Sequence, residues 1–599
     1  MVAGSKILVL DFGGQYAHLL ARRVREIGVY SQILLPDVST DKLKEASGII
    51  LSGGPSSVYE KDAPKFNPDI FKLDIPILGL CYGQQLIGHE LKGIVQPGKI
   101  KEYGSANLSQ TGGRLFQGLP KNFTVWMSHG DAISKLPKGF VATASTTDCK
   151  FAAIENVEKK IYGLQFHPEV SHTQNGIKIL SNFVLDICRC KKDWDMKSYL
   201  KLIINEVKKE VNNKKVFLLL SGGVDSTVAL ALLAKAVPKG HLFALHVDTG
   251  FMRKGESALV KEEIEKLELE DIHVLEASEK FLNAVKNTTE PEEKRHIIGQ
   301  LFVDLALEEM KKLGFSEKDW LLGQGTIYPD TIETGATKHS NKIKTHHNRA
   351  PIIMKMIEDG KVIEPLKQLY KDEVRELGKF LNLPEKLVNR RPFPGPGLAI
   401  RILCSSKEES VNKKSEKEII DLAKKSGYIA TLLPVKAVGV QGDNRTYRNT
   451  VLLEGDFDYA KLEALSTSIT NSSKEVNRVI YLISPQKCES AKPIVAYLTK
   501  ERIKKLQQAD SVAMQEADSE KFNEDIWQFP VVLLPLNFNS IGEVVVLRPI
   551  TSKEAMTAKF YPLDEKIAKQ ISEKILKIKG IGAVTIDVTH KPPATIEWE

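Results

Sequence analysis

The sequence predicts an α/β protein of several domains, and three observations support this fold class. The chain has 599 residues, enough for about three or four domains. Short apolar strands alternate with amphipathic helices through residues 1–190 and again through 199–400, which is typical of parallel sheets covered by helices. The last part of the chain repeats the order strand, strand, helix, strand, which predicts two C-terminal α+β subdomains.

Residues 1–195 are predicted to form the first domain, in which a largely parallel sheet is covered by helices. A polar stretch, Cys190–Ser198, links it to the next domain. The predicted strands are Ile7–Leu10, Gly48–Leu51, Ile77–Leu80 and Ile161–Phe166, and the predicted helices are Ala17–Ile27 and Gln84–Leu91.

Residues 196–403 are predicted to form a second α/β domain. Residues 334–349 are rich in Lys, His, Asn and Thr, and this stretch is either a mobile lid or an ordinary surface loop. The proline- and glycine-rich run Arg391–Gly397 breaks any helix and precedes the next region. The predicted strands of this domain are Val216–Leu220, Leu242–Val247, Ile272–Leu275 and Trp320–Gly323.

The remaining chain is predicted to hold a first C-terminal subdomain at 404–500 and a second at 501–599. Three pairs of similar segments carry the internal repeat. They are Leu432–Val435 with Leu533–Leu536, Val451–Leu453 with Val544–Leu547, and Val476–Tyr481 with Ile581–Ile586.

Composition bounds the class of protein. Hydrophobic residues make up 42% of the chain, yet no segment has the roughly 18 consecutive apolar residues that span a bilayer. Six scattered cysteines and an N-terminus that runs straight into a strand favour a cytoplasmic protein of the cytosol. The net charge of +8 suits small anionic substrates as well as RNA, so it does not decide between them.

The apolar run Val216–Leu220 leads into Ser221-Gly222-Gly223-Val224-Asp225-Ser226, which we interpret as a phosphate-binding loop. Two glycines let the backbone present its N–H groups to an anion, and the following helix directs its positive end at the same place. The Ser hydroxyls and the Asp225 carboxylate complete a site for magnesium-bound pyrophosphate. No Gly-Lys-Ser/Thr follows, so this is not a Walker A loop. The string resembles the PP-loop of the ATP pyrophosphatases, which implies AMP as the product.

A second site is predicted in the first domain. Ile77–Leu80 ends at Cys81, and Gly79 and Gly83 flank this cysteine as glycines flank the nucleophile of a sharp strand-to-helix turn. A helix N-terminus favours the thiolate. Downstream, His167 can act as the base, and Glu169 can orient its imidazole.

The residues around Cys81 add an oxyanion hole and a specific resemblance. The backbone N–H groups of Gly54 and Tyr82 can stabilise an oxyanion. Gly79–Gln84 and His167-Pro-Glu169 resemble a class I glutamine amidotransferase, which implies that Cys81 releases ammonia from glutamine through a thioester. The resemblance also implies glutamine contacts, by Gln85, Ser128, His129 and Asp131.

The whole chain resembles the glutamine-hydrolysing GMP synthetases. The motifs that carry the resemblance are Asp11–Gln15, Arg391–Gly397, Gln441–Arg445 and the tail Lys591–Glu599. The family makes GMP from xanthosine monophosphate (XMP) through an adenyl-XMP intermediate. The resemblance implies that Lys371 acts in catalysis near the phosphates, that Val247 and Gly323 line the ATP pocket, and that XMP is bound by Arg295, Asp443, Gln528, Lys591 and Glu597.

Two C-terminal subdomains resemble the long form of that family, in which the extra copy can replace a partner chain. We therefore expect a monomer or a weak homodimer that needs no membrane and no nucleic acid. Mg²⁺ with ATP is the expected cofactor, with no organic cofactor. The alternatives are another PP-loop amidotransferase, such as one that makes NAD from its deamido precursor, an RNA-modifying PP-loop enzyme, and a non-catalytic interaction protein.

Overall fold

The computed structural model describes residues 5–14, 16–61, 63–170, 172–265, 272–315, 319–328, 330, 351–406, 411–441, 444–519, 525–552 and 558–599. Asp443 and the stretch 334–349, predicted as a lid or loop, lie outside these ranges. The described chain forms two compact units, which we call unit 1 (up to Ile203) and unit 2 (from Ile204 onward). The finer domain boundaries given above stay predictions.

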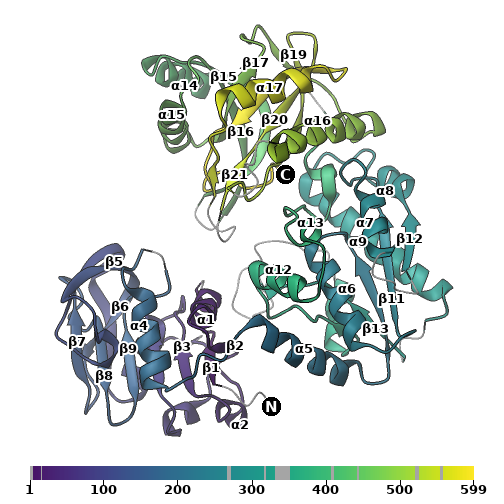
Figure 1. The fold of residues 1–599 in the computed structure, drawn as a ribbon. Helices are drawn as coiled ribbons and strands as arrows, with labels where there is room; N and C mark the ends of the chain where they lie inside the picture. Colours follow the sequence, from purple (N-terminus) through teal and green to yellow (C-terminus); the bar gives the residue numbers. More distant parts are fainter. Residues whose placement is uncertain are drawn as a thin grey trace. The chain divides into compact units, whose positions relative to one another are not determined.

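Unit 1 contains one nine-stranded sheet in the order β2-β1-β3-β4-β9-β8-β7-β5-β6 (Figure 1). Its strands are β1 (Lys6–Leu10), β2 (Tyr30–Leu34), β3 (Gly48–Leu51), β4 (Ile77–Leu80), β5 (Ile94–Gln110), β6 (Asn122–Lys135), β7 (Val141–Ser145), β8 (Ala153–Asn156) and β9 (Ile161–Leu164). Its α-helices are α1 (Ala17–Glu26), α2 (Thr40–Leu43), α3 (Tyr82–Glu90) and α4 (Gly176–Ser181).

The sheet of unit 1 has a parallel part and an antiparallel part. Strands β2, β1, β3, β4 and β9 pair in parallel, which confirms the predicted sheet and its four predicted strands. Strands β8, β7, β5 and β6 continue the sheet with antiparallel pairing, which the sequence did not predict. Every residue of β3, β4 and β9 is buried, which is why these strands are continuous apolar runs.

Unit 2 begins with a five-stranded parallel sheet in the order β12-β11-β10-β13-β14. Its strands are β10 (Lys215–Leu220), β11 (Leu242–Asp248), β12 (Ile272–Glu276), β13 (Trp320–Gly323) and β14 (Val362–Ile363). Its helices are α6 (Val224–Ala236), α7 (Glu256–Glu265), α8 (Ser278–Ala284), α9 (Pro291–Lys312), α11 (Pro351–Glu358), α12 (Lys371–Phe380) and α13 (Glu385–Val388), and α5 (Met196–Val211) crosses the division between the units.

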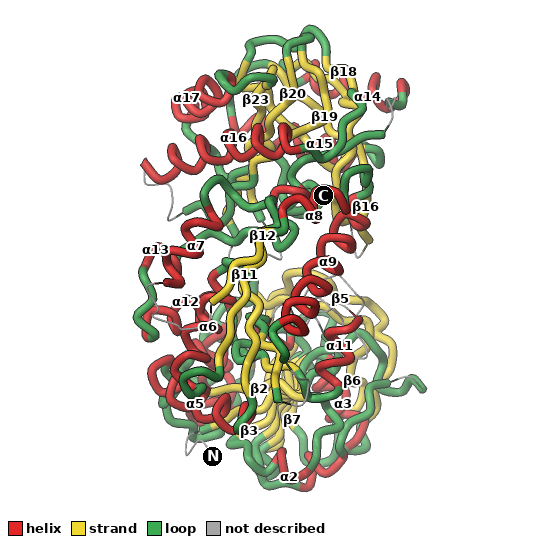
Figure 2. Tube along the Cα trace, turned by 90° about the vertical axis from the view of Figure 1, so that its right-hand side faces the viewer, coloured by secondary structure: helices red, strands yellow, loops and turns green. Residues whose placement is uncertain are grey.

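The order of this sheet reverses at β10. The chain moves outward from β10 through β11 to β12 and then returns to place β13 on the other side of β10. Because parallel crossovers are right-handed, this reversal puts α6 and α9 on opposite faces of the sheet, as Figure 2 shows. Ligands of such sheets bind at the carboxyl ends of the strands beside the reversal, so the loop after β10 lies at the expected place.

The C-terminal part of unit 2 combines both predicted repeats in one seven-stranded sheet, with the order β15-β16-β17-β23-β20-β19-β18. The predicted order strand, strand, helix, strand is confirmed in the first copy. In the second copy the short strands β21 and β22, which form a sheet of their own, stand between the second strand and the helix. The copies meet where β17 pairs antiparallel with β23. The elements are α14 (Lys413–Lys425), β15 (Ile429–Gln441), β16 (Asn444–Glu454), α15 (Tyr459–Ser472), β17 (Val476–Ser484), β18 (Ala491–Pro493), α16 (Lys500–Ser519), β19 (Val531–Phe538), β20 (Gly542–Leu547), β21 (Ile550–Thr551), β22 (Lys559–Phe560), α17 (Glu565–Leu576) and β23 (Ile581–Asp587).

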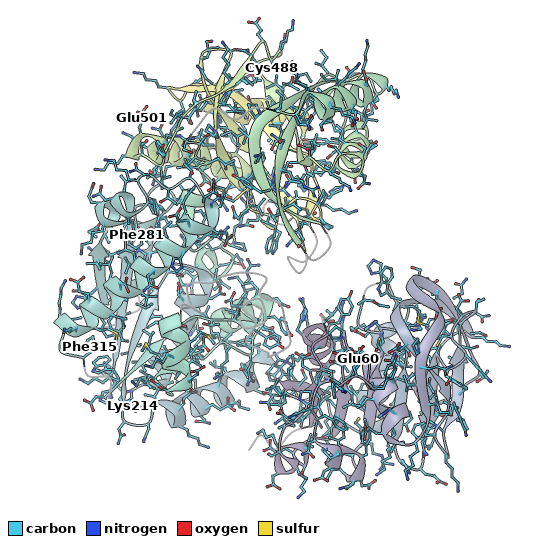
Figure 3. All side chains as sticks on the ribbon, turned by 180° about the vertical axis from the view of Figure 1, so that it is seen from behind. Glu60, Lys214, Phe281, Phe315, Cys488 and Glu501 are labelled. Atoms are coloured by element: carbon cyan, nitrogen blue, oxygen red, sulfur yellow. The ribbon has the colours of Figure 1, made fainter. Side chains whose placement is uncertain are left out.

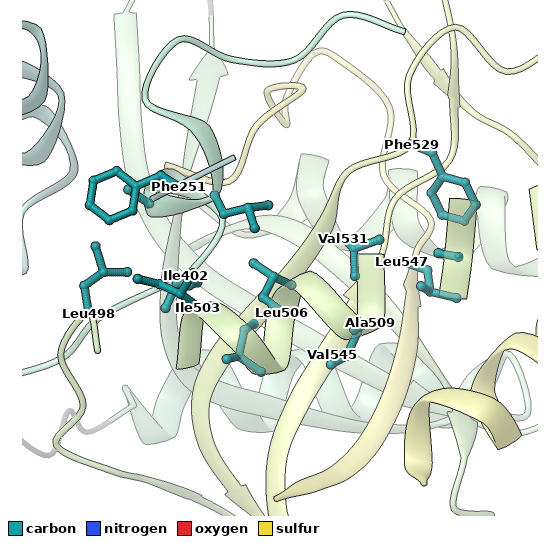
Figure 4. Close-up of a cluster of buried hydrophobic side chains, with 14 of the residues drawn as sticks. Phe251, Ile402, Leu498, Ile503, Leu506, Ala509, Phe529, Val531, Val545 and Leu547 are labelled. Carbon is teal, nitrogen blue, oxygen red and sulfur yellow. The ribbon is translucent and has the colours of Figure 1, made fainter. Parts of the chain in front are cut away.

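A continuous apolar core joins the two sheets of unit 2. Phe251 and Ile402 belong to the same cluster as Leu506 of α16 and Val545 of β20 (Figure 4). In the same cluster, Phe217 and Phe243 stack with ring centroids 5.2 Å apart, and Phe315, labelled in Figure 3, packs edge-on against both. Burial of such side chains removes apolar area from water and fixes the C-terminal sheet on the first sheet of unit 2.

Among the described residues, no helix combines the length and the apolar character that crossing a membrane requires.

Candidate functional site

The turn between β4 and α3 holds Cys81 in a strained conformation. Cys81 has φ 50° and ψ −104°, a region that non-glycine residues rarely adopt. A Cβ on Gly79 would lie 2.4 Å from the carbonyl oxygen of Gly83, and a Cβ on Gly83 would lie 2.4 Å from that of Leu51. Both glycines are therefore required by close backbone approach, as the sequence predicted for a nucleophile turn.

His167 and Glu169 form a buried pair beside Cys81. His167 Nδ1 lies 2.7 Å from Glu169 Oε1, and the side chains are only 6% and 1% exposed. Burial alone would lower the pKa of His167, but the Glu169 carboxylate and hydrogen bonds with Cys81 and Glu169 outweigh it and raise this pKa to about 10. The imidazole is therefore charged at neutral pH.

The backbone around Cys81 offers N–H groups for an oxyanion. Tyr82 is the first residue of α3, and the first N–H groups of a helix have no partner within that helix. A Cβ on Gly54 would lie 3.3 Å from the ring of Tyr82, and one on Gly53 would lie 3.1 Å from His167. The turn after β3 thus lies against both Tyr82 and His167, and the roles of Gly54 and Tyr82 as oxyanion donors stay predictions.

The residues predicted to bind glutamine lie next to the nucleophile but have partners within unit 1. The thiol of Cys81 donates to the Ser128 carbonyl oxygen, 3.5 Å away. Gln85 Nε2 donates to the Asp131 carbonyl oxygen at 2.8 Å, and His129 Nδ1 lies 3.0 Å from the same oxygen. The Asp131 carboxylate hydrogen-bonds with Tyr59. The roles of these four residues in glutamine binding stay predictions.

A second cysteine near this site differs sharply from Cys81. Burial and the Glu102 carboxylate raise the pKa of Cys149 to about 12, so its thiol stays protonated at neutral pH and is a poor nucleophile. The sequence analysis did not assign a role to Cys149 or to Glu102.

In unit 2, the loop between β10 and α6 has the hydrogen bonds of a preformed turn. Gly222 has φ +76°, and Gly223 is the N-cap of α6, which begins at Val224. The hydroxyls of Ser221 and Ser226 lie 3.1 Å apart, and that of Ser226 donates to the Gly223 carbonyl oxygen at 3.1 Å. The predicted strand, glycine turn and helix are confirmed, and backbone N–H groups at the helix N-terminus suit an anion.

Asp225 and Lys371 meet across this loop although 146 residues separate them. Lys371 Nζ lies 2.7 and 2.6 Å from the two oxygens of Asp225, and the side chains are 27% and 24% exposed. Lys371 is the first residue of α12, and α12 packs against α6. The structure thus brings the residue predicted to hold Mg²⁺ together with the lysine predicted to act near the phosphates.

Other predicted ATP-site residues surround the loop. Val247 lies near the carboxyl end of β11, and Gly323 ends β13, so they lie on strands that pair with β10 on either side. A Cβ on Gly325 would lie 2.7 Å from the Ser226 backbone nitrogen, which places the loop after β13 directly on the phosphate-loop turn.

Arg390 supports the same loop, and sequence reasoning did not identify it. Its guanidinium donates to the Gly222 carbonyl oxygen and to the buried carboxylate of Glu256 in α7. The only sequence signal for Arg390 is its position directly before the proline-rich run. Its contact with Gly222, 168 residues away, could not be inferred from that position.

The residues predicted to bind XMP divide into two groups in unit 2. Gln528 Nε2 donates to Glu597 Oε1 at 3.3 Å, and Arg401 holds Glu597 with two hydrogen bonds of 2.9 and 2.8 Å. Arg295 donates to the backbone oxygen of Glu599. The tail therefore brings Arg295, Gln528 and Glu597 towards one region, with Arg401 as an added cation that the sequence analysis missed.

Lys591 lies elsewhere on the tail, where its backbone pairs with Ala558. Asp443, the last of the predicted XMP-binding residues, lies outside the described residues.

Comparisons with known proteins agree with this organisation. Residues 8–187 match the family model for class-I glutamine amidotransferases. Residues 215–316 match the phosphoadenosine phosphosulfate reductase domain model, and residues 416–491 and 515–598 match the model for the GMP synthase C terminal domain. The chain is therefore a class I glutamine amidotransferase unit joined to a PP-loop-type nucleotide domain.

Similar proteins then define the family. A protein of Leptospira interrogans named "Probable GMP synthase (glutamine-hydrolyzing)" is 44% identical over 612 residues, which cover 100% of both chains. The GMP synthase (glutamine-hydrolyzing) of Thermosipho melanesiensis is 45% identical over 504 residues, covering 80% of this chain and 98% of its own. The chain belongs to the family of glutamine-hydrolyzing GMP synthases.

A solved structure of a GMP synthase subunit from Thermoplasma acidophilum is 34% identical to this chain. The match covers 34% of this chain and 98% of the solved one, with a TM-score of 0.29.

Proposed function

We propose that this chain makes GMP from XMP, with glutamine as the nitrogen donor and ATP as the activating substrate. Glutamine and water give glutamate and ammonia, and XMP, ATP and ammonia give GMP, AMP and pyrophosphate. The observation that carries the proposal is the presence, in one chain, of a buried Cys–His–Glu arrangement and a PP-loop turn. Full-length similarity to glutamine-hydrolyzing GMP synthases supports the same assignment.

The first half-reaction is assigned to unit 1. The Cys81 sulfur attacks the carboxamide carbon of glutamine, and the N–H groups of Gly54 and Tyr82 stabilise the oxyanion that forms. His167 gives its proton to the departing ammonia, and water then cleaves the thioester to release glutamate. Glu169 holds the imidazole through Nδ1, which leaves Nε2 to face the sulfur and the leaving group.

The second half-reaction is assigned to the loop Ser221–Ser226. The 2-oxygen of XMP attacks the α-phosphorus of ATP and pyrophosphate leaves; ammonia then attacks C2, and AMP leaves with that oxygen. The loop N–H groups and Lys371 face the phosphates. A carboxylate together with substrate phosphates is a usual Mg²⁺ donor set, so Asp225 fits the role of holding Mg²⁺, which would neutralise phosphate charge.

XMP is assigned to the surface near the tail. We assign its recognition to Arg295, Asp443, Gln528, Lys591 and Glu597, as the family motifs imply. Arg295 supplies a planar cation suited to phosphate, and the amide of Gln528 suits a purine edge. The ion pair of Glu597 with Arg401 gives this carboxylate one strong partner before any substrate binds.

The experiment that tests the proposal follows ATP by the products it yields. Purified full-length protein is incubated with MgATP, ammonium chloride and XMP, and the nucleotides are separated by chromatography. We expect GMP and AMP in equal amounts. Formation of ADP, or activity with deamido-NAD in place of XMP, contradicts the proposal. Tight, salt-sensitive tRNA binding would instead favour an RNA-modifying enzyme.

We further propose that one chain is sufficient for activity and that it works in the cytoplasm. In the seven-stranded sheet, the two C-terminal copies pair with each other within the chain, which supports a competent monomer. Sedimentation of the active enzyme during turnover tests this point, because activity confined to a dimer contradicts it.

A further inference from the structure

Three buried side chains of unit 1, which the proposed reaction does not use as reacting groups, converge on one point. They are Glu102, His129 and Cys149, and one ligand atom of each lies within 4.8 Å of the others. Their residues are 8%, 5% and 3% exposed, so all three are almost fully removed from water. A carboxylate, an imidazole and a thiol gathered in this way are donor types that bind transition metals.

The antiparallel part of the sheet builds this cluster. Glu102 of β5 and His129 of β6 are direct cross-strand partners in the register of the two strands. Cys149 follows β7 in a tight turn, in which the Thr146 backbone N–H donates to the Cys149 carbonyl oxygen at 2.9 Å. Cross-strand partners have adjacent side chains, so this arrangement follows from the strand register itself.

Both ring nitrogens of His129 face oxygen acceptors. Nδ1 lies 3.0 Å from the Asp131 carbonyl oxygen, and Nε2 lies 3.0 Å from Glu102 Oε2. A neutral imidazole has only one N–H, and the carbonyl can only accept, so the Nδ1 proton is committed to Asp131. Nε2 then faces the Glu102 carboxylate oxygen, and either a proton or a metal ion can lie between the two atoms.

Beside the contact of His129 with Glu102, the surroundings share features with metal sites. Metal-binding histidines usually donate their second ring N–H to a carbonyl, as His129 does to Asp131. The Thr146 hydroxyl donates to Glu102 Oε1 at 2.9 Å, which orients the carboxylate. The Phe151 backbone N–H donates to the Cys149 sulfur, which stabilises negative charge on that atom.

We propose that Glu102, His129 and Cys149 bind one Zn²⁺ ion inside unit 1. Sulfur, nitrogen and oxygen donors together select a borderline metal such as zinc and not Mg²⁺ or Ca²⁺. Zinc bonds of about 2.0–2.3 Å place neighbouring tetrahedral donors roughly 3.3–3.7 Å apart. The donor atoms of this cluster lie within 4.8 Å of one another, so the farthest of them would close by up to about 1 Å on binding. Carboxylate and thiolate together neutralise the ion, which suits a buried position.

Binding forms a Zn–S bond at Cys149 and releases the thiol proton to solvent. The ion would also fix β6 next to the nucleophile, because Ser128, the residue before His129, accepts the hydrogen bond from the Cys81 thiol. The zinc site therefore differs from the Cys81 site in its ligands but shares a strand with it.

Cobalt(II) is the probe, because it replaces zinc and reports its ligands by absorption. The full chain carries Cys81→Ser, which removes the catalytic thiol as a competing ligand. We expect one equivalent of Co²⁺ to give a sulfur-to-cobalt charge-transfer band and the intense visible bands of tetrahedral cobalt, both removed by one equivalent of Zn²⁺. Proton release on Zn²⁺ addition, read with a pH indicator, gives a second measurement.

Cys149→Ser is expected to abolish the charge-transfer band and to weaken Zn²⁺ binding about 100-fold. The matched control is Cys188→Ser, which removes another free thiol of unit 1 that is not part of the cluster and should leave the band intact. If Cys149→Ser fails to fold, Glu102→Gln keeps the sulfur band and should weaken binding at least about 10-fold. Absence of the band in the Cys81→Ser chain, or its loss only in Cys188→Ser, overturns the proposal.

Discussion

The Cys81 site of unit 1 and the phosphate loop of unit 2 differ in how deeply their functional side chains are buried and in how they are paired. In unit 1, His167 and Glu169 are 6% and 1% exposed and already hold each other and the nucleophile in position. In unit 2, Asp225 and Lys371 are 24% and 27% exposed and neutralise each other. The first site is complete without its substrate, whereas the charges of the second are arranged to receive one.

This difference has a physical reason. A nucleophile and a charged imidazole need a dry, preorganised environment before glutamine arrives, so the fold must hold them together internally. A loop that binds MgATP must instead exchange an internal ion pair for interactions with metal and phosphate, and a partly exposed pair is cheap to separate. The two sites should therefore respond differently to substitution.

The largest expected effect comes from removing the nucleophile. Cys81→Ala should reduce glutamine-dependent GMP synthesis by about 10⁴-fold or more, because no other group replaces the sulfur. Synthesis from ammonium salt should change by less than about twofold, since unit 2 is untouched. Rates with each nitrogen donor are measured in parallel, with Cys488→Ala as the control cysteine. Equal loss with both donors would show that Cys81 is structural.

The second-largest effect should reduce the rate of GMP synthesis equally with glutamine and with ammonium. Asp225→Asn should lower GMP synthesis about 10³-fold with glutamine and with ammonium alike, because the carboxylate proposed to hold Mg²⁺ and pair with Lys371 is lost. Glu385→Gln, which changes an exposed carboxylate in the first turn of α13, is the matched control. A rate recovered fully by ammonium would contradict the assignment.

A smaller effect on rate, with a clear pH signature, is expected for Glu169→Gln. Glutamine-dependent synthesis should fall about 100-fold, since the imidazole loses the negative charge of its partner. The pKa of His167 rises from 6.5 to about 10 on folding, so its contribution to the stability of unit 1 is fully present below pH 6.5 and is lost as pH rises through 10. The wild-type free energy of unfolding should therefore decline by a few kcal/mol, at most about 5, across this range.

In Glu169→Gln this decline should shrink and end at a lower pH, because the charge that raises the pKa of His167 is gone. Pulse proteolysis in urea at a series of pH values measures it, with the fragment of unit 1 read separately. Glu155→Gln, which removes another buried carboxylate of unit 1, is the control and should keep the wild-type slope. An unchanged slope in Glu169→Gln would refute the charged imidazole.

The smallest effect should come from substituting Arg390, which holds the phosphate loop through the Gly222 carbonyl oxygen. Arg390→Lys keeps the charge but cannot reach both the Gly222 carbonyl oxygen and Glu256, so the KM for ATP should rise about 10-fold with little change in kcat. Arg391→Lys, whose guanidinium contacts Met514 instead, is the comparison. Steady-state kinetics with ammonium as donor separates the two parameters.

Sequence reasoning worked best where burial makes the pattern unambiguous. The parallel strands β3, β4 and β13 were predicted with their observed bounds, because strands buried on both faces are uninterrupted apolar runs. The long strands β5 and β6 were missed. In β6, buried and half-buried positions alternate from 123 to 130, but of the buried positions only Phe123, Val125 and Met127 are apolar before the buried His129 interrupts the pattern. For the same reason, the pairing of Glu102 with His129 could not be foreseen.

The residues of the two sites were also predictable only where strand geometry brings them together. Cys81 and His167 follow strands β4 and β9, which are neighbours, so parallel-sheet geometry alone suggested their meeting. The pairing of Lys371 with Asp225, and of Arg390 with Gly222, depends on how distant helices and loops pack on the sheet. Local sequence carries no record of such packing, and only the family resemblance pointed to Lys371.

The backbone of Cys81 has a consequence for how this chain can change over evolutionary time. A side chain held at φ 50° destabilises the fold by about 1–3 kcal/mol, which glycine would not do. Cys81→Gly should therefore melt at a higher temperature than the parent while losing all use of glutamine. Selection for glutamine use must continually oppose this stabilising substitution. In an ammonia-rich habitat that selection would relax, and position 81 would be among the first to drift.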